Sequence, residues 1–223
     1  NIYEIQPGFI LYFQPPKMSG AIKTYWIVSG KINAINENKV CEHGDMIVLT
    51  KEDEPYLLEA LEFTKVLLHS VNDDSFLNTD NNFNRIHQVM SKIQEKDSYT
   101  VDHSVSVSRL VEKMGIKLGY TGQKMLNLLT AAQYHDIGKI DTPNEILNKP
   151  SRLNEEEFEI MKRHVSNGEA LILETFSQDI YDIIIQHHER FNGSGYPKGL
   201  KEHEICHEAR IRSEERRVGK ECR

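Results

Sequence analysis

The sequence predicts an α+β chain in which a small antiparallel β-roll precedes an all-α helical bundle. Short β-forming runs broken by turn residues fill about the first 71 residues, whereas apolar residues at helical spacing dominate from residue 97 onward. A chain of 223 residues with 39% hydrophobic content is large enough for two modest globular domains. We therefore expect a β domain at residues 1–71, a linker and connecting helix at 72–96, a helical domain at 97–211 and a separate tail at 212–223.

The β domain is predicted from runs that are rich in β-branched and aromatic residues. These runs are Phe9–Phe13, Tyr25–Val28, Lys31–Ile35, Met46–Thr50, Tyr56–Leu61 and Phe63–His69. Turn residues such as Ser29-Gly30 and His43-Gly44-Asp45 separate them, and strands at such close spacing are typical of a small roll or barrel.

The segment Tyr25–Ile32, followed by Gly44–Leu49, resembles the cupin-like jelly roll. This resemblance implies a sensory or dimerising domain. The His-x-His pair that metal-binding cupins carry is missing from this half of the sequence, and we interpret His43 and His69 as surface or turn residues. We therefore assign no metal site to the β domain.

Charge and cysteine content narrow the classes of function. A formal net charge of −7 argues against broad binding to nucleic-acid phosphates, which requires a basic face. The longest apolar runs are strand-sized, and the first residues show no signal-peptide pattern. Three scattered cysteines, Cys41, Cys206 and Cys222, form an odd set that fits a reducing compartment. We expect a cytoplasmic protein whose partners include neither a nucleic-acid polymer nor a membrane.

The connecting segment combines a polar stretch with a short helix. Residues 72–84 are rich in Asn and Asp, which is typical of a linker. A narrow apolar stripe at helical spacing follows, made of Phe83, Ile86, Met90 and Ile93. This stripe either packs against the neighbouring domain or forms a homodimer contact through residues 83–93.

Two helix starts can be located in the helical domain. Thr121-Gly122 predicts the start of one helix. Asn154 followed by Glu157 predicts a capping box at the start of another, with acidic residues at the positive end of the helix.

The same domain carries polar residues on its predicted core-facing stripes, where an unpaired imidazole or carboxylate is costly to bury. They are His103, His135, Asp136, His164, His187 and His188. The stripe of His103 runs on to Leu118, and that of His164 includes Phe158. Any one of these histidines can be a satisfied core residue, but polar groups converging from several helices are how bundles build metal sites. Imidazole and carboxylate suit iron, manganese or zinc, and the two oxygens of Asp136 can serve two ions.

The motifs of this domain resemble the HD-GYP family of metal-dependent phosphodiesterases, an HD-type helical bundle. The matching pieces, in the expected order, are Tyr99–Ser104, His135–Lys139, Leu147–Pro150, Leu153–Glu157, His164 and His187–Pro197. The resemblance covers about residues 97–211.

The resemblance implies two divalent metal ions, with iron or manganese expected. The ligands that it implies for one ion are His103, His135 and Asp136, and those for the other are Asp136, His164, His187 and His188. Asp136 then bridges the two ions. Two such ions activate water and stabilise both the attacking and the leaving oxygens of a phosphodiester.

The family also implies residues that contact the substrate. Lys139 is expected to place a fixed cation on a phosphate oxygen and to act in catalysis with Asp136, although a solvated lysine at a helix end is the alternative. Arg190 is expected either to contact phosphate or to pair with Glu189 or Glu157. The residues expected to border the substrate pocket are Gly193, Gly195, Tyr196 and Pro197.

The function that the resemblance implies is hydrolysis of the bacterial second messenger cyclic di-GMP to pGpG, with GMP as a further product. A broader form of the same hypothesis is that the substrate is another cyclic dinucleotide. The alternative from a different class is a non-catalytic signalling module that binds a nucleotide or a partner through the same fold.

The sequence departs from the family pattern at three places. Asn192 stands where the family usually has Asp, and we expect it to adjust a turn. Tyr99 stands where members with a third metal carry a Glu ligand, so we expect two metals. From about Arg212 the sequence resembles a translated sequencing adapter, whereas the family continues into a helix that carries a further Asp ligand. We therefore expect an incomplete helical domain followed by an artefactual tail, with a natural charged tail as the alternative.

Overall fold

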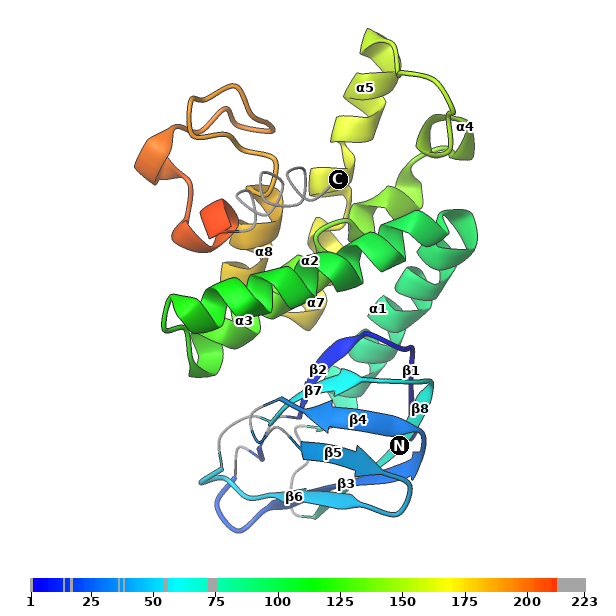
Figure 1. Ribbon diagram of the computed structural model, residues 1–223, viewed down its shortest axis with the longest axis vertical. Helices are drawn as coiled ribbons and strands as arrows, with labels where there is room; N and C mark the ends of the chain where they lie inside the picture. Colours follow the sequence, from blue (N-terminus) through cyan, green and yellow to red (C-terminus); the bar gives the residue numbers. More distant parts are fainter. Residues whose placement is uncertain are drawn as a thin grey trace. The chain divides into compact units, whose positions relative to one another are not determined.

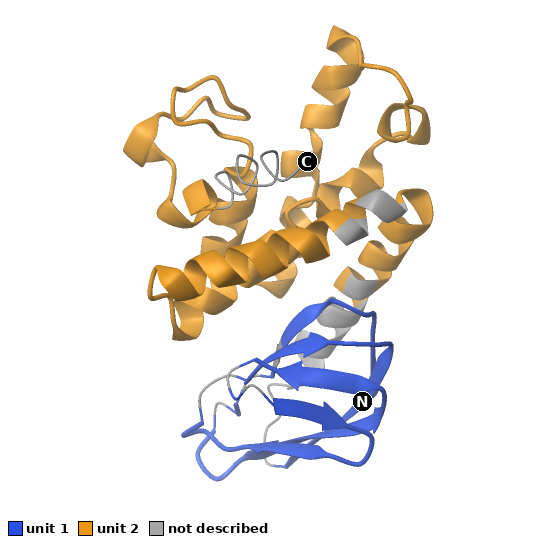
Figure 2. Cartoon of the chain, in the orientation of Figure 1, with its two compact units in different colours: residues 1–84 blue, residues 85–223 orange. Residues whose placement is uncertain are grey.

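The computed structural model describes residues 2–13, 15–16, 18–35, 37, 39–53, 56–71 and 76–211, except for the side chains of residues 12, 76–84, 87, 98–99 and 101–102. It divides into two compact units, Asn1–Asn84 and Arg85–Arg223 (Figure 2). Several predictions fall outside the described residues: those on the first linker residues, on the side chains of Phe83 and Tyr99, and on the tail with Cys222. Within the described residues, no helix is both long and apolar enough to cross a membrane.

The first unit consists of two four-stranded antiparallel sheets (Figure 1). Its strands are β1 (Ile2–Ile5), β2 (Ile10–Phe13), β3 (Ile22–Ser29), β4 (Lys31–Ala34), β5 (Lys39–Glu42), β6 (Met46–Leu49), β7 (Tyr56–Ala60) and β8 (Thr64–Val71). One sheet has the order β1-β8-β3-β6 and the other the order β2-β7-β4-β5. Their alternating side chains bury a core that includes Ile27, Ile32, Leu58 and Val66. The predicted antiparallel β unit is confirmed.

Two of these strands were not predicted from the sequence. Strand β1 and strand β5 each bury a single residue, Ile5 and Cys41 respectively, so neither shows the apolar alternation that identifies a strand. They form because β8 and β4 offer them backbone partners.

The second unit is helical. Its elements are α1 (Phe76–Lys96, which begins before the unit boundary), α2 (Ser98–Lys117), α3 (Gly122–Tyr134), the 3-10 helix η1 (Ile137–Asp141), α4 (Asn144–Leu147), α5 (Glu155–Lys162), α6 (His164–Asn167), α7 (Glu169–Thr175), α8 (Gln178–Ile185) and the 3-10 helix η2 (Glu202–Glu204). Helix α3 packs between α2 and α8 (Figure 1). Its buried residues, such as Leu128 and Leu129, form the core with Val111 and Ile184. The α+β prediction is therefore confirmed.

Both predicted helix starts are confirmed. Helix α3 begins at Gly122, directly after Thr121. At the start of α5 the Asn154 side chain accepts a hydrogen bond from the Glu157 backbone at 2.8 Å, and the Glu157 carboxylate accepts one from the Asn154 backbone at 2.9 Å. This reciprocal pair is a capping box.

The apolar stripes were predicted less well at their ends. Ile86, Met90 and Ile93 are buried within a single chain, so the predicted dimer contact through residues 83–93 is not supported. Leu118 is 53% exposed because α2 ends at Lys117, so its predicted place in the core is wrong. Phe158 is 45% exposed, and it lies at a pocket rather than in the core.

Candidate metal centre and adjoining pocket

The carboxylate of Asp136 lies at the centre of a histidine cluster. Its Oδ1 atom is 3.2 Å from Nε2 of His164 and 4.0 Å from Nε2 of His187, while its Oδ2 atom is 3.1 Å from Nε2 of His135. The Nε2 atoms of His164 and His187 are 3.4 Å apart. The side chain of Asp136 is only 6% exposed, so this charge is held almost entirely by the surrounding protein.

The cluster forms two overlapping groups of potential metal ligands. One group is His103, His135 and Asp136, and the other is Asp136, His164, His187 and His188. Within each group the ligand atoms all lie within 4.8 Å of one another. The structure thus brings together all six predicted ligands, in the two sets that the sequence resemblance implied, and Asp136 belongs to both sets.

Three of these histidines are oriented by the same backbone contact. Nδ1 of His135 lies 2.7 Å from the carbonyl of Ala132, Nδ1 of His164 lies 2.7 Å from that of Met161, and Nδ1 of His187 lies 2.6 Å from that of Ile184. Each imidazole follows the last turn of a helix, where carbonyl groups have no partner within the helix. A carbonyl can only accept, so Nδ1 donates and the lone pair of Nε2 points into the cluster.

This arrangement fits transition-metal ions. Neutral imidazoles that present Nε2 and have Nδ1 fixed by a carbonyl are the usual form of histidine ligands. Combined with a carboxylate, they make a nitrogen and oxygen donor set suited to iron, manganese or zinc.

The ionisation state of Asp136 is consistent with a ligand role. Burial raises the pKa of this carboxyl. In the protein without metal, however, a proton on Nε2 of His135, the charge of Lys139 and a hydrogen bond from His164 hold the pKa well below its usual range, and a bound metal ion would replace those Nε2 protons. The group is therefore a carboxylate at neutral pH.

Two glycines let the histidine-bearing segments approach each other closely. A Cβ atom at Gly138 would lie 2.0 Å from the carbonyl oxygen of His164, and one at Gly168 would lie 2.6 Å from the side chain of Ile137. Only glycine fits at either position without moving backbone or a buried side chain. These contacts pack η1 on α6 and thereby hold His164 beside Asp136. The signal for this packing in the sequence is a glycine two residues after the His-Asp pair, which sequence reasoning did not use.

Lys139 lies next to the cluster. Its Nζ atom is 2.9 Å from Oδ2 of Asp136 and 3.4 Å from the hydroxyl of Thr100. The alternative of a fully solvated lysine is therefore wrong for this structure, since the side chain is 17% exposed. Its contact with a phosphate remains a prediction.

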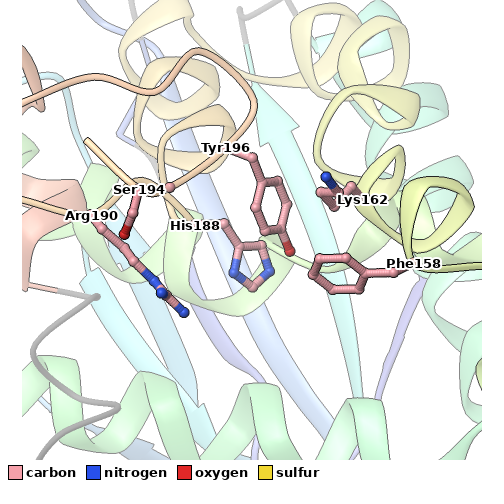
Figure 3. A pocket seen from close by; sticks show the side chains of 7 residues that line it. Phe158, Lys162, His188, Arg190, Ser194 and Tyr196 are labelled. Carbon is pink, nitrogen blue, oxygen red and sulfur yellow. The ribbon is translucent and has the colours of Figure 1, made fainter. Parts of the chain in front are cut away.

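A pocket adjoins the cluster and shares one residue with it. The pocket is lined by Phe158, Lys162, His188, Arg190, Ser194, Gly195 and Tyr196 (Figure 3). Its volume of about 380 Å³ lies within the range of small-molecule sites. His188 belongs both to this lining and to the second ligand group, so the pocket reaches the metal centre.

The walls of the pocket are aromatic and cationic. The rings of His188 and Tyr196 are stacked, with centroids 4.6 Å apart, and Phe158 meets Tyr196 edge to face at 6.2 Å. Lys162 and Arg190 lie on opposite sides of His188 (Figure 3). Nζ of Lys162 is 5.1 Å from the ring centroid of Phe158 and 5.8 Å from that of Tyr196.

The predicted substrate contacts map onto this pocket in part. Arg190, Gly195 and Tyr196 line it, whereas Lys139, Gly193 and Pro197 are not among its lining residues. Sequence reasoning missed three lining residues, Phe158, Lys162 and Ser194. The spacing of Lys162 two residues before His164 was the available signal for that cation, because neighbours of a metal ligand lie close to the centre.

The loop that carries Arg190 and Tyr196 is fixed by a buried carboxylate. Glu189 is 2% exposed, and its two oxygens accept hydrogen bonds from the backbone of Lys198 at 2.7 Å and of Leu200 at 2.9 Å.

The predicted alternative partners of Arg190 have other partners in this structure. Glu189 binds the loop backbone, and Glu157 forms an ion pair with Lys149. At Gly195 a Cβ atom would lie 2.4 Å from backbone atoms of Glu189 and Arg190. Asn192 does act in a turn, because its side-chain oxygen accepts hydrogen bonds from the backbone and hydroxyl of Ser194.

The chain is similar in sequence to curated phosphodiesterases that act on cyclic dinucleotides. The chain is 34% identical over 152 residues to a cyclic di-GMP phosphodiesterase of Thermotoga maritima, a match that covers 66% of this chain and 41% of that protein. It is 36% identical over 122 residues to a cyclic di-GMP phosphodiesterase of Pseudomonas aeruginosa, covering 54% of this chain and 30% of the relative. A 3'3'-cGAMP-specific phosphodiesterase of Vibrio cholerae is 36% identical over 110 residues, covering 49% of this chain and 26% of the relative.

The matches cover only part of each relative. The chain spans well under half the length of these three curated proteins. Among solved structures, the chain shows a weak overall likeness to Bd1817 from Bdellovibrio bacteriovorus, with a TM-score of 0.45 and 18% identity over 96% of this chain and 85% of that one.

One family model covers more than half of the chain. It is described as an HD domain and matches residues 87–211, the segment that contains both ligand groups and the adjoining pocket. The predicted relationship to the HD-type phosphodiesterases is confirmed, and the chain belongs to the HD domain family.

Proposed function

We propose that this chain is the catalytic part of a metal-dependent phosphodiesterase that hydrolyses cyclic di-GMP. The observation that carries the proposal is that His188 belongs both to the second ligand group and to a pocket with two cationic and two aromatic side chains. A bound dinucleotide can therefore place a phosphate next to the metal centre. The names of the relatives from Thermotoga maritima and Pseudomonas aeruginosa support this substrate.

Two divalent ions, iron or manganese, are proposed as cofactors. The first would be held by His103, His135 and Asp136, and the second by Asp136, His164, His187 and His188. When bound, such ions supply a nucleophile from water at neutral pH and positive charge for the phosphoryl oxygens.

The remaining residues are assigned to binding and to charge stabilisation. Lys162 and Arg190 offer cations to the two phosphates of the substrate, and the rings of Phe158 and Tyr196 offer surfaces on which a base stacks. Lys139 keeps a fixed positive charge beside Asp136, where it offsets negative charge that develops on the phosphate in the transition state. Gly193 and Pro197 shape the loop that carries Tyr196.

The proposed product is linear pGpG, with GMP formed by a second cleavage. Because a relative from Vibrio cholerae is named as specific for 3'3'-cGAMP, that dinucleotide is the second candidate substrate. The two substrates differ in one purine base. We therefore expect the residues that contact the bases, Phe158 and Tyr196, to discriminate between them.

The decisive experiment measures metal content and turnover in the same samples. The chain is loaded with Mn²⁺ or Fe²⁺, bound metal is counted by mass spectrometry, and cyclic di-GMP and 3'3'-cGAMP are followed by chromatography. We expect metal-dependent formation of pGpG, and a loss of roughly 1,000-fold or more in Asp136→Asn, which keeps the side-chain shape but removes the shared charge. The matched control is His203→Asn, an exposed histidine outside both ligand groups.

The alternative class, a non-catalytic binding module, predicts a different result in that experiment. Metal would be retained at two ions per chain and cyclic di-GMP would bind, but no product would form with either substrate. That outcome would replace the hydrolase proposal.

For the β unit we propose a cupin-like jelly roll with a sensory or dimerising role. Its strand orders, β1-β8-β3-β6 and β2-β7-β4-β5, support this because they are those of eight strands wound as two Greek keys into two packed sheets. The free thiols of Cys41 and Cys206 support the further proposal that the protein acts in the cytoplasm.

A further inference from the structure

The outer face of the β1-β8-β3-β6 sheet is apolar although it is exposed. Along β3 the side chains of Tyr25 and Ile27 point into the core, and the intervening Trp26 points outward and is 45% exposed. The same alternation places Met46 outward on β6, where it is 62% exposed, and Ile2 outward on β1, where it is 59% exposed. We call this surface the β3 face.

The strand register joins these residues into one row. Ile2 lies opposite Leu67, Leu67 lies opposite Trp26, and Trp26 lies opposite Met46, so the row crosses all four strands. Val48 and the pair Ile22 and Val71 extend the apolar surface along the strands, and all three are at least 40% exposed. Cross-strand neighbours lie about 5 Å apart, so the side chains of the row touch one another. The outward-facing pair Thr24 and His69 separates Ile22 and Val71 from this row.

The other sheet lacks such a surface. Of the described side chains in strands β2, β7, β4 and β5, only Val40 is a large apolar residue that is exposed. Single exposed apolar residues are common on monomeric proteins, but a contiguous patch that contains a tryptophan marks an interface.

Size and charge identify a second copy of the chain as the occupant. With four strands about 4.8 Å apart and β3 and β8 eight residues long, the β3 face measures about 19 Å by 26 Å at its widest. Two such faces together bury roughly 1,000 Å², which is the lower limit for a specific interface and fits a weak homodimer. The chain carries a net charge of −7, which opposes self-association. The β3 face adds no like-charge repulsion of its own, because its charged pair Lys65 and Glu4 is self-neutralising, with Nζ and Oε1 2.7 Å apart.

We propose that the β3 face is the interface of a homodimer, in which two β units pack sheet against sheet about a two-fold axis. This interface differs from the predicted contact through residues 83–93, whose residues Ile86 and Ile93 are already fully buried within one chain. The inference does not depend on the proposed phosphodiesterase activity.

The experiment uses sedimentation velocity of the full chain from nanomolar to high micromolar concentration, together with tryptophan fluorescence. Trp26 is the single tryptophan of the sequence, so its emission and its quenching by iodide report on the β3 face alone. We expect a concentration-dependent dimer, with the emission of Trp26 shifted to shorter wavelength and its quenching reduced in step with dimer formation.

Two variants test the interface from its opposite edges. Met46→Lys and Ile2→Lys each place a charge at an exposed edge position of the β3 face, so the fold is retained while like charges meet across the two-fold axis. Each is expected to weaken the dimer roughly 100-fold or more. The matched control is Ile116→Lys, which adds the same charge at a position on α2 that is 59% exposed. Circular dichroism checks that all three variants remain folded.

Three results would overturn the proposal. A chain that stays monomeric at every concentration with Trp26 open to iodide would show that nothing covers the face. A monomer with Trp26 shielded would assign the face to the rest of the same chain. A dimer that Met46→Lys, Ile2→Lys and Ile116→Lys affect equally would place the interface elsewhere.

Discussion

At the scale of single residues, the candidate metal centre is built from histidines whose orientation the protein fixes by itself. His135, His164 and His187 each donate Nδ1 to a carbonyl three residues earlier, so their Nε2 atoms are directed without help from a ligand. This preorganisation reduces the conformational entropy that metal binding would otherwise have to overcome. Their positions could be predicted from the sequence because imidazoles on several apolar stripes are costly to bury unless they converge on a common partner.

His135→Ala and Asp136→Ala are each expected to abolish metal-dependent turnover while leaving helical content largely intact. Each change removes a ligand but keeps the apolar contacts of α3, which form most of the local core. Turnover per bound metal and far-ultraviolet circular dichroism are the measurements. Activity that survives in both variants would remove these residues from the mechanism.

Gly138→Ala is expected to lower both the thermal midpoint and the affinity for metal. The new methyl group would meet the carbonyl oxygen of His164 at 2.0 Å, and relieving such a clash moves backbone at a cost of about 1–3 kcal/mol. Because the displaced residue is a predicted ligand, metal affinity measured by competition with a chelating dye should fall as well.

Gly115→Ala is the matched control for that substitution. The three atoms nearest to its methyl group would be side-chain atoms of Met125 and Leu128, starting with the flexible end of Met125. Alanine is also favoured over glycine within a helix by about 1 kcal/mol. The control should therefore keep or raise the midpoint and leave metal affinity unchanged. Equal losses in both variants would show that the Gly138 contact has no special role.

At the scale of elements, the end of α1 and the first turn of α2 hold the 3-10 helix of the candidate metal centre. Nζ of Lys96 donates to the carbonyls of Ile140 at 2.7 Å and Thr142 at 2.9 Å, and the hydroxyl of Thr100 is 3.4 Å from Nζ of Lys139. Helix η1, between His135-Asp136 and α4, is thus fastened at its C-terminal end by α1. A side-chain cation is suited to this because the last carbonyls of a helical turn have no partners within it.

Lys96→Met is expected to destabilise the helical unit by about 1–3 kcal/mol, since two charge-assisted hydrogen bonds are lost while the aliphatic stem is kept. Lys92→Met, an exposed position on the same helix, is the control and should change stability by less than about 0.5 kcal/mol. Urea unfolding monitored by circular dichroism measures both. Indistinguishable midpoints would mean that solvent replaces the Lys96 contacts without loss.

The sequence predicted the elements better than their edges. The start of α3 was identified because it is marked by Thr121-Gly122. Leu118 and Phe158 were misplaced because helical spacing says which residues share a face but not where a helix stops or whether a pocket interrupts its face. The position of Lys162 two residues before His164 places it near the centre, but its contact with Tyr196 depends on the approach of a distant loop, which helical spacing does not predict.

At the scale of the whole molecule, two units with separate buried cores share one chain. Because each unit has a hydrophobic core of its own, we expect the two units to unfold in separate transitions rather than in one two-state transition. Under the proposed function, only the helical unit binds metal, and an ion that binds the folded state stabilises that state alone.

Removal of metal with a chelator is therefore expected to lower the thermal midpoint seen by circular dichroism at 222 nm, which reports mainly on helices. The midpoint seen by fluorescence of Trp26, which lies in β3 of the first unit, should stay unchanged at fixed protein concentration. The shift should be several degrees for a ligand present at about 100 times its dissociation constant. A parallel shift of both signals would mean that the units unfold together.

That both ligand groups include Asp136 has a consequence for how the centre fills. The carboxylate of Asp136 supplies a single negative charge, and the first cation to bind would neutralise it. The second cation would then bind more weakly, unless a bridging anion restored negative charge to the centre. A binding isotherm for Mn²⁺ should then show two steps with the weaker one strengthened by added phosphate, and preparations made under scarce metal should carry about one ion per polypeptide.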